Sequence, residues 1–325
     1  MTPKRIVILG GGGFIGSAVA ERLAAQGDPL VIPTRVLARA NHLALLPTAD
    51  IRQANIHDDA TLHALLSGAD AVINLVGILH PEGRAGFDGA HVALPRAVAK
   101  ACVKQGVATL IHMSALNADV NGVSEYLRSR GRGEAAVREA LHGSAVRLAV
   151  LRPSVVFGRH DNFLNMLAGL VRKFLVIPLG SPGARFQPVH VEDVADVIVQ
   201  CLDQPELGDS PLELGGPRIY TMRELVDFVI ATLGARRLVV PLPDALAMIQ
   251  ALAFEFPPGK WLGAALGVAL TRDNVRSMSQ PNVTALPLPA ALHWRPAALE
   301  PTAVEYLQGR NHRSRLQGCR ERAGR

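Results

Sequence analysis

A glycine-rich loop near the start of the chain has the residue types and spacing to bind phosphate groups. The apolar run 5–9 leads into residues 10–16, with the sequence GGGGFIG, and a helical pattern follows to residue 26. The first glycine permits a tight turn, the middle one lets a pyrophosphate approach the backbone, and the last lets helix and strand pack closely. The N-terminus of the helix adds free N–H groups and a positive dipole, so we expect a dinucleotide site here, the alternative being a turn with no ligand. The expected contacts are Gly10, Gly13, Phe14, Ile15 and Gly16.

Two arginines follow the second predicted strand, 29–33. At this place NAD sites usually carry an Asp or Glu that holds the ribose 2′-hydroxyl. Here the chain has Arg35, with Arg39 one turn further on, and no acidic residue between 31 and 39. A guanidinium suits a 2′-phosphate, so the sequence favours NADP(H) over NAD(H). The alternative is that both arginines only solvate the surface of a helix.

Several further runs resemble one superfamily. The glycine spacing is similar to the Gly-x-x-Gly-x-x-Gly of the short-chain dehydrogenases/reductases, in particular their extended and atypical branches, and Asn-Leu-Val-Gly at 74–77 is similar to their Asn-x-Ala-Gly turn. More narrowly, six runs resemble the bacterial relatives of the nucleotide-binding accessory subunit of respiratory complex I, which are similar to NAD-dependent epimerases/dehydratases. These runs are 31–35, 74–79, 113–116, 151–158, 161–165 and 187–194. The resemblance covers nearly the whole chain and implies a tightly held NADP(H) in a Rossmann domain, in a group where turnover is often absent or unproven.

The resemblance also implies further contacts with the cofactor. Asn55 follows the third strand, where the family commonly has Asp against adenine; Asn keeps an acceptor and adds donors. His91 stands where extended members often carry Asn, and either replaces its hydrogen bonds or serves packing. The run 152–158 resembles the segment that covers the nicotinamide end, the alternative being a plain exit from a strand. The residues carried over are Asn55, Ile56, Leu75, Val76, Gly77, His91, Pro153 and Val156.

Ser114, Tyr126 and Arg130 match the catalytic positions of the superfamily. Its enzymes use a Tyr as acid and base, a Lys four residues later that lowers the Tyr pKa and holds the nicotinamide ribose, and a Ser that polarises the substrate carbonyl. Tyr126 and Arg130 would share one face of a helix, and a fixed positive charge could stabilise a phenolate. Arginine does not give up its proton, however, so proton relay here is doubtful. Catalysis, cofactor anchoring and a purely structural Tyr remain the alternatives.

The elements that must position these residues follow an α/β order. Six predicted strands alternate with helical patterns, which predicts a Rossmann doubly wound parallel sheet with its crevice at the carboxyl ends of the strands. The run 186–189 and the helical pattern 192–202 would return to this sheet, with Glu192 and Asp193 in the first turn of the helix. The strands are expected at 5–9, 29–33, 50–54, 70–76, 107–113 and 146–151, and the helices at 14–26, 38–46, 58–67, 88–105 and 124–142.

We expect three regions along the chain. The Rossmann domain comprises 1–157 and 184–204, and a smaller, irregular substrate or interaction domain comprises 158–183 and 205–309. An Arg-rich tail at 310–325 holds too few apolar residues to fold alone. His57, Asp58, Asp59 and His63 lie at a helix start, where acidic capping accounts for them better than a metal does, so no metal site is expected.

The charge of the chain lies mostly in its tail. The 325 residues carry a formal net charge of +6, and six arginines against one glutamate in 310–325 account for most of it. The rest is nearly neutral, so no nucleic-acid partner is expected, and the anion site is the glycine loop with Arg35. Three cysteines without a CxxC pair support neither a disulfide scaffold nor a thiolate zinc site.

Three functional hypotheses follow. The first is an NADP(H)-binding protein that is weakly active or uses the nucleotide structurally. The second is an active NAD(P)-dependent epimerase or reductase with an apolar, lipid- or quinone-like substrate. The third is a membrane-peripheral interaction or assembly module, with respiratory-complex subunits as partners, in which the apolar segment 244–270 and the Arg tail act together. The expected location is cytoplasmic, because the three scattered cysteines suit a reducing compartment, with the inner face of the membrane as a site of association. No apolar run is long enough to span a membrane.

Overall fold

The computed structural model describes residues 3–80, 86–208, 210–243, 246, 248–249, 251–252 and 271–308. The chain divides into two compact units. Unit 1 comprises Met1–Pro153, Val191–Leu214 and Thr284–Arg295, and unit 2 comprises Ser154–His190, Gly215–Val283 and Pro296–Arg325. Compared with the predicted domains, unit 1 takes in the later segments 205–214 and 284–295, and it ends four residues earlier at its first boundary.

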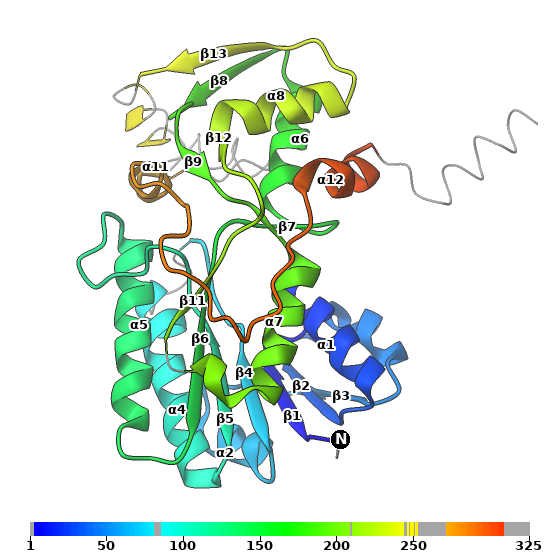
Figure 1. The fold of residues 1–325 in the computed structure, drawn as a ribbon, viewed down its shortest axis with the longest axis vertical. Coiled ribbons are helices and arrows are strands. Elements are labelled where there is room, and N and C mark those ends of the chain that lie inside the picture. Colours follow the sequence, from blue (N-terminus) through cyan, green and yellow to red (C-terminus); the bar gives the residue numbers. More distant parts are fainter. Residues whose placement is uncertain are drawn as a thin grey trace, which may run out of the picture. The chain divides into compact units, whose positions relative to one another are not determined.

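Unit 1 is built on a seven-stranded sheet in the order β11-β6-β5-β4-β1-β2-β3 (Figure 1). All of its strand pairs are parallel. This confirms the predicted doubly wound α/β sheet, and the strand order reverses between β1 and β4, where such folds bind ligands. The strands are β1 (Ile6–Leu9), β2 (Leu30–Thr34), β3 (Ala49–Gln53), β4 (Ala71–Asn74), β5 (Thr109–Met113), β6 (Arg147–Pro153) and β11 (Leu212–Leu214).

Helices cover the two faces of this sheet, with α2, α4 and α5 on one side and α1 and α7 on the other (Figure 1). Apolar side chains from α2, α4 and α5 form one core with those of β1, β2, β4 and β5. Asp58 caps α2 by accepting a hydrogen bond from the Thr61 N–H at 2.8 Å, as predicted for this acidic cluster. The bounds are α1 (Phe14–Gln26), α2 (Asp59–Leu66), α3 (Gly86–Asp88), a π-helical turn (Gly89–Ala93), α4 (Leu94–Gln105), α5 (Glu125–Leu141) and α7 (Val191–Asp203).

The prediction of a single continuous helix at 38–46 is wrong. Two 3-10 turns, Leu37–Arg39 and Asn41–Leu45, occupy this stretch. Ala40 lies between them, fully buried, and its N–H bonds back to the Leu37 carbonyl at 2.9 Å. Burying this small residue beside the glycine loop divides the stretch into two short turns, which i+3 hydrogen bonds suit.

The run 186–189 does not join the main sheet, contrary to prediction. Its residues fall into two very short strands, β9 (Arg185–Phe186) and β10 (Val189–His190), separated by Pro188, which has no N–H to donate to a ladder. The helix that follows, α7, does pack in unit 1, and Glu192 and Asp193 lie in its first turn as predicted. The strand that extends the sheet is β11, after α7.

Unit 2 is a mixture of paired strands and short helices. β7 (Val156–Phe157) pairs with β10, β9 pairs with β12 (Tyr220–Thr221), and β8 (Val176–Gly180) pairs with β13 (Leu238–Leu242). Its core combines apolar residues of β8 and β13 with those of the helices. These helices are α6 (Phe163–Lys173), α8 (Met222–Thr232), α11 (Arg272–Met278) and α12 (Leu299–Leu307).

A buried ion pair joins α5 to β6 in unit 1. Glu134 accepts two hydrogen bonds from Arg152, at 2.8 Å from Nε and 2.7 Å from Nη2, and its side chain is only 6% exposed. On the other side Glu213 of β11 stands opposite Arg152 in the strand register. The hydrogen bonds that Arg152 donates to Glu134 raise the pKa of Arg152, and the charge of Glu213 acts in the same direction.

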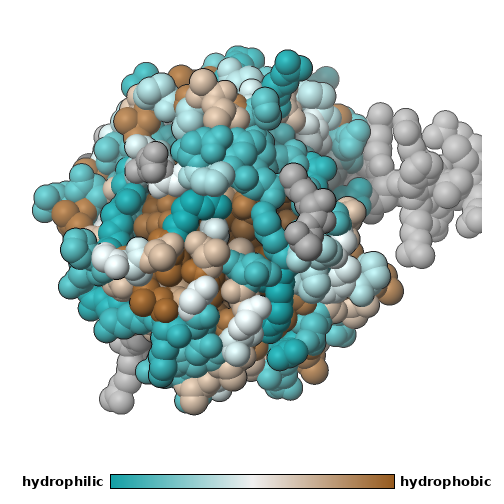
Figure 2. Space-filling view, turned by 60° about the horizontal axis from the view of Figure 1, so that its bottom comes forward, coloured by the Kyte–Doolittle hydropathy of each residue, from teal (hydrophilic) through white to brown (hydrophobic). Residues whose placement is uncertain are grey.

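None of the described helices is long and apolar enough to cross a membrane. The predicted membrane-active elements lie largely outside the described residues: most of the segment 244–270 and the whole tail 310–325. Much of the face seen in Figure 2 is hydrophilic, with apolar side chains gathered near its middle. Apolar surface of this kind is ordinary in globular proteins, so an interaction site needs a more specific argument.

Candidate functional site

The glycine loop forms a tight turn against the end of β4. Gly10 has a φ of +83°, which favours glycine. The Gly13 N–H donates to the Gly10 carbonyl at 3.0 Å, and the Gly11 N–H donates to the Ile8 carbonyl at 3.2 Å. A Cβ at Gly10 would lie 3.2 Å from the Leu75 carbonyl carbon, so the loop and the end of β4 are in contact.

Helix α1 begins directly after this turn and packs closely onto it. A Cβ at Gly16 would overlap the Gly10 carbonyl oxygen and lie 2.6 Å from the Gly11 Cα. The N-cap residue is Gly13, so no side chain caps the helix, and its first turn holds no acidic residue. The helix therefore starts with backbone N–H donors and a positive dipole that an anion can use.

The turn that carries Arg39, the second of the two arginines after β2, lies against this loop along the backbone. A Cβ at Gly12 would lie 3.2 Å from the Ala40 Cβ and 3.5 Å from the Arg39 carbonyl oxygen. Arg35 and Arg39 are both exposed, and neither forms an ion pair with any described residue. Both cations are therefore available to an anionic ligand.

The predicted contacts at the ends of β3 and β4 occupy loop positions. Asn55 accepts a hydrogen bond from the His57 N–H at 3.2 Å through its Oδ1, and Ile56 packs at the edge of the core. Leu75 extends β4, because its N–H donates to the Leu9 carbonyl at 2.9 Å. Val76 is half-buried, and its N–H donates to Asn74 Oδ1 at 3.2 Å.

Arg130 is a buried cation at the centre of unit 1. The residue is 8% exposed, and its Nη1 donates to the Met113 carbonyl at 3.1 Å. Its guanidinium lies against Gly77, where a Cβ would overlap Nη2, and 5.5 Å from the centre of the Tyr126 ring. Arg130 has no carboxylate partner among the described residues, and its Nε has no hydrogen-bond partner there. A buried charge without such partners is costly, so this position is suited to oxygen atoms of a ligand.

Ser114 and Tyr126 lie in the same unit as Arg130. Ser114 follows β5 and is 3% exposed, and its N–H donates to the Leu151 carbonyl at 2.7 Å. Its hydroxyl has no hydrogen-bond partner among the described residues. Tyr126 is half-buried, and its ring meets the Phe87 ring edge-on with centroids 6.0 Å apart.

His91 uses both ring nitrogens inside the protein. Ser129 Oγ donates to the Tyr126 carbonyl at 2.8 Å, so it accepts its 2.8 Å bond from His91 Nδ1. His91 Nε2 accepts from the Ile78 N–H at 3.1 Å. These bonds define a neutral imidazole with its proton on Nδ1. His91 therefore acts on the site by holding the backbone just after Gly77.

The two buried histidines near Arg130 should make the fold acid-sensitive. Burial, then the charge of Arg130 and the nearby His112, lowers the pKa of His91 from 6.5 to about 3. Burial, then the charges of Arg130 and Arg138, lowers the pKa of His112 from 6.5 to about 3. Between these values the unfolded chain binds more protons than the folded one, so acid favours unfolding.

We therefore expect the free energy of unfolding to be highest above pH 6.5 and to fall as the pH drops toward about 3. Urea denaturation at several pH values across this range measures the slope. The substitution His91→Asn removes one titrating group and should flatten the dependence. A slope unchanged by His91→Asn would contradict the assignment of this residue as neutral and buried.

Helix α5, which carries Tyr126 and Arg130, is held between two backbone segments. A Cβ at Gly131 would overlap the Asp119 carbonyl carbon, and a Cβ at Gly133 would overlap the His91 carbonyl oxygen. The helix begins after Ser124, which caps it by accepting from the Leu127 N–H at 3.2 Å. Two glycines in a helix interior cost conformational entropy, and here they permit this close packing.

Two of the predicted contacts lie at the boundary of the units. Pro153 ends β6 in unit 1, and its carbonyl accepts from the Leu116 N–H at 3.1 Å. Val156 lies in β7 of unit 2. The other predicted site residues, from Gly10 to Arg130, all belong to unit 1.

Sequence analysis missed the polar pair beneath the site. Asn74 and His112 are opposite each other in the register of β4 and β5, are 1% and 2% exposed, and are 3.4 Å apart from Nδ2 to Nδ1. Their signal was available, because Asn74 ends an otherwise apolar run and His112 is a polar residue near the end of the next strand. Ser129, the partner of His91, gave no such signal.

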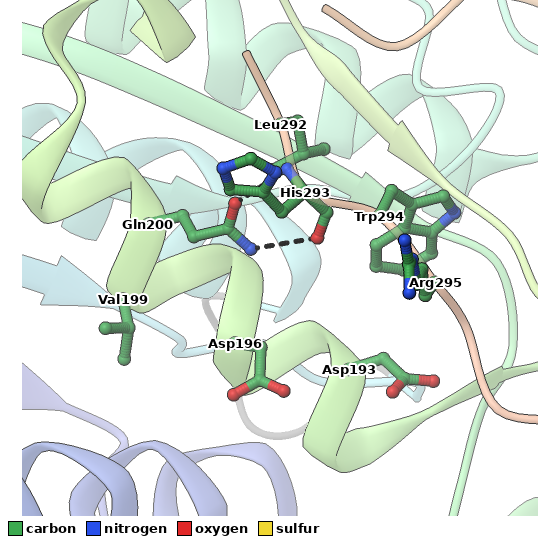
Figure 3. A pocket seen from close by; sticks show the side chains of 8 residues that line it. All are labelled: Asp193, Asp196, Val199, Gln200, Leu292, His293, Trp294 and Arg295. Atoms are coloured by element: carbon green, nitrogen blue, oxygen red, sulfur yellow. Dashed lines mark hydrogen bonds between the residues drawn. The ribbon is translucent and has the colours of Figure 1, made fainter. Parts of the chain in front are cut away.

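A separate hollow lies on unit 1 along α7 (Figure 3). Its volume is about 460 Å³, and its lining comes from α7 and the segment 292–295. Gln200 fixes this segment by donating to the His293 carbonyl at 3.2 Å and accepting from its N–H at 2.9 Å. None of the predicted site residues lines this hollow.

The fold and the site together define a class of protein. A glycine turn between a parallel strand and a helix, next to the reversal of strand order, is the arrangement of dinucleotide-binding α/β proteins. Gly10 supplies the turn and the start of α1 supplies N–H donors. The Arg130 Nε and the Ser114 hydroxyl are buried and have no hydrogen-bond partner among the described residues, so a ligand can satisfy them. The residues present therefore fit a bound dinucleotide.

Comparison with known proteins gives the family. The model for the NAD dependent epimerase/dehydratase family matches residues 6–215. The mouse protein "NADH dehydrogenase (ubiquinone) 1 alpha subcomplex subunit 9, mitochondrial" is 30% identical over 322 residues, covering 94% of this chain and 80% of that protein. The chain belongs to the NAD-dependent epimerase/dehydratase family, and its relation to this complex I subunit confirms the resemblance seen in the sequence. A dinucleotide cofactor is expected from the family.

Two further matches extend the comparison. The ceramide reductase of Caulobacter vibrioides is 29% identical over 240 residues, covering 74% of each chain. The solved structure of UDP-glucuronic acid 4-epimerase from Bacillus cereus, in complex with UDP-glucuronic acid and NAD, has a TM-score of 0.71 at 16% identity. It covers 94% of this chain and all of that one. The structural match shows that the fold is shared.

Proposed function

We propose that this protein binds NADP(H) in unit 1 and holds it mainly as a structural element, with weak or no turnover. The observation that carries the proposal is Arg130, a buried, permanently charged group at the position where active relatives in the superfamily carry lysine. A guanidinium with an unpartnered Nε can hold hydroxyl or phosphate oxygens. It does not exchange a proton near neutral pH, so it anchors a ligand but does not relay protons to Tyr126.

The neighbours of Arg130 support anchoring in the same way. His91 is neutral, and its two hydrogen bonds fix the Ile78 backbone and Ser129. The glycine loop and the start of α1 would hold the pyrophosphate. When bound, the nucleotide supplies a hydride donor or acceptor. The mouse relative is named as a subunit of a dehydrogenase complex, and a nucleotide held as a structural element suits a protein that works as part of an assembly.

Arg35 and Arg39 support the choice of NADP(H) over NAD(H). Both are exposed and have no carboxylate partner among the described residues, and the Arg39 backbone lies beside Gly12. A 2′-phosphate would meet two cations there, whereas a 2′-hydroxyl would find no carboxylate to accept its hydrogen bond. The protein as purified should therefore retain NADP(H), which native mass spectrometry identifies.

Replacing Arg35 and Arg39 by alanine should weaken NADPH binding by about 10–100-fold and leave NADH binding unchanged. Each guanidinium contributes a charge-assisted hydrogen bond that only the 2′-phosphate can accept. Calorimetric titration with both nucleotides makes the comparison. Arg52→Ala is the matched control, because Arg52 is also exposed but pairs with Asp50 at 2.6 Å. Equal affinity of the wild type for NADPH and NADH would overturn the preference.

A reductase is the second candidate. The Ser114 hydroxyl favours this candidate, because it is buried and has no hydrogen-bond partner among the described residues. A hydroxyl that polarises a substrate carbonyl has to be free to donate a hydrogen bond when the substrate binds. The ceramide reductase of Caulobacter suggests an apolar lipid as the substrate class. Assembly with respiratory-complex subunits, suggested by the name of the mouse relative, is compatible with either function.

Tyr126→Phe separates the two candidates. If the nucleotide is structural, the variant should bind NADPH as tightly as the wild type and show the same gain in melting temperature on binding. If the protein is a reductase, the same variant should lose NADPH oxidation by at least about 100-fold, because the phenol is the proton donor. NADPH consumption with lipid and quinone carbonyl compounds measures the activity.

A further inference from the structure

The pair of strands β8 and β13 in unit 2 has an apolar outer face that nothing in the described part of the chain covers. The inner side chains Ile177, Leu179 and Val239 are buried in the core of unit 2. The alternate positions are also apolar but exposed: Val176 is 50% exposed and Leu238 is 62% exposed. Parallel strands that are apolar on both faces are normally covered on both faces.

The strand register gathers these exposed residues into one patch. Leu238 stands opposite Val176, and Val240 stands opposite Pro178. Leu175, just before β8, is 73% exposed, and Val240 is 37% exposed. We call the four alternate strand residues Val176, Pro178, Leu238 and Val240 the outer patch. Its members lie on two adjacent strands at one end of unit 2, so the patch is continuous.

Basic residues lie at one end of the outer patch. Both strands start at the same end, because the Leu238 N–H donates to the Leu175 carbonyl at 3.0 Å. Arg172 and Lys173 precede β8, and Arg236 and Arg237 precede β13. The Arg237 Nε donates to the Val171 carbonyl at 2.6 Å, which brings the two basic pairs together. No Asp or Glu occurs in 163–180 or in 228–243, the two stretches that form this region.

We propose that the outer patch and its basic end dock unit 2 onto an anionic lipid bilayer. An apolar face enters the interfacial region, and exposed basic residues at its end, Arg236 in particular, meet the lipid phosphates. The Arg172 and Arg237 side chains also donate to backbone carbonyls of unit 2, at 2.8 and 2.6 Å, and add positive charge to this end of the patch. The charge supports this occupant: a second copy of the chain would bring like charges against one another, whereas a lipid surface supplies the opposite charge. The docking surface involves no residue assigned to the nucleotide site, so it is independent of the proposed function.

Flotation of the full chain with lipid vesicles tests the docking. The protein should bind vesicles of phosphatidylcholine containing about one-third phosphatidylglycerol and should bind pure phosphatidylcholine at least about tenfold less. Leu238→Glu should weaken binding to the anionic vesicles by about tenfold or more, because it places a carboxylate on the apolar face. Leu45→Glu is the matched control, since Leu45 is 89% exposed but lies in unit 1, and it should bind as the wild type does.

Arg236→Glu tests the contribution of the basic end to vesicle binding. It also replaces Leu238→Glu as the test variant if Leu238→Glu fails to fold. It should weaken binding by about fivefold or more, whereas Arg236→Lys should retain it. Unchanged NADPH binding and melting temperature confirm that each variant is folded. The proposal is overturned if the wild type does not bind anionic vesicles or binds neutral ones equally. It is also overturned if Leu45→Glu is as damaging as Leu238→Glu, or if Leu238→Glu instead dissociates a dimer in sedimentation measurements.

Discussion

Gly16→Ala should abolish measurable nucleotide binding, a loss of at least about 100-fold, and destabilise the fold by about 1–3 kcal/mol. A methyl group at this position would meet the Gly10 carbonyl oxygen and the Gly11 backbone, neither of which is a flexible side chain that could move aside. The turn and the start of α1 would have to separate, and the N–H groups that face the phosphates would lose their arrangement. Calorimetric titration with NADPH and urea denaturation measure the two effects.

Gly169→Ala is the matched control for this substitution. Gly169 lies inside α6, and a Cβ there would meet nothing within 4 Å. The same change should therefore stabilise the protein by about 0.5–1 kcal/mol, as expected for alanine in a helix interior, and leave nucleotide binding intact. Retention of full NADPH affinity by Gly16→Ala would refute the assignment of the glycine loop as the pyrophosphate site.

Glu134→Gln should cost about 2–3 kcal/mol of stability. The substitution keeps the shape of the side chain but removes the charge that pairs with Arg152, whose side chain is 21% exposed. Glu213 remains nearby, but its carboxylate already accepts from the N–H groups of Ala285 and Leu286, at 2.7 and 3.0 Å. We also expect weaker NADPH binding, because Glu134 lies one turn beyond Arg130 on α5 and fixes that helix to β6.

The same helix provides the control. Glu139 pairs with Arg96 at 3.2 Å, but these side chains are 75% and 47% exposed. Glu139→Gln should therefore change the free energy of unfolding by less than about 1 kcal/mol and should not affect NADPH binding. Urea denaturation of both variants makes the comparison. Equal effects of the two substitutions would mean that the Glu134–Arg152 pair contributes no more than a surface ion pair.

The main sheet could be predicted because local pattern and fold agree there. Each of the six expected strands is present within two residues of its predicted ends, and the glycine loop joins β1 to α1 where its spacing placed it. Apolar runs of four or more residues between glycine-rich or polar turns are typical of buried parallel strands. The family resemblance rested on the same runs and is confirmed.

Elements whose form depends on distant contacts could not be predicted. The stretch 38–46 reads as helical, but burial of Ala40 beside Gly12 divides it into two turns. The run 186–189 reads as a strand of the main sheet, but it pairs with β7 and β12 instead. Strand β11 has only three residues, too few to show a period of two.

The candidate site was predictable in its residue types but not in its environment. The spacing of Tyr126 and Arg130 predicts that they share a helix face. The Arg130 guanidinium does lie over the Tyr126 ring, 5.5 Å from its centre. Sequence spacing contains no information about burial, and it is the burial of Arg130, with no hydrogen-bond partner for its Nε among the described residues, that suits it to hold a ligand. The neutral state of His91 likewise depends on burial, and its tautomer depends on hydrogen bonds to the Ile78 backbone and to Ser129, none of which the sequence shows.

The packing of α5 has an evolutionary consequence. With Gly131 against Asp119 and Gly133 against His91, the helix has no room to rotate or to slide along its axis. Tyr126 and position 130 therefore keep their places whatever side chain stands there, and new chemistry at this site must arise by exchange of residues on a fixed backbone. Arg130→Lys alone would restore the Tyr-x-x-x-Lys pattern of the active relatives. On the proposed function, a nucleotide-holding protein and a potential catalyst would be separated by one substitution, without any change of fold.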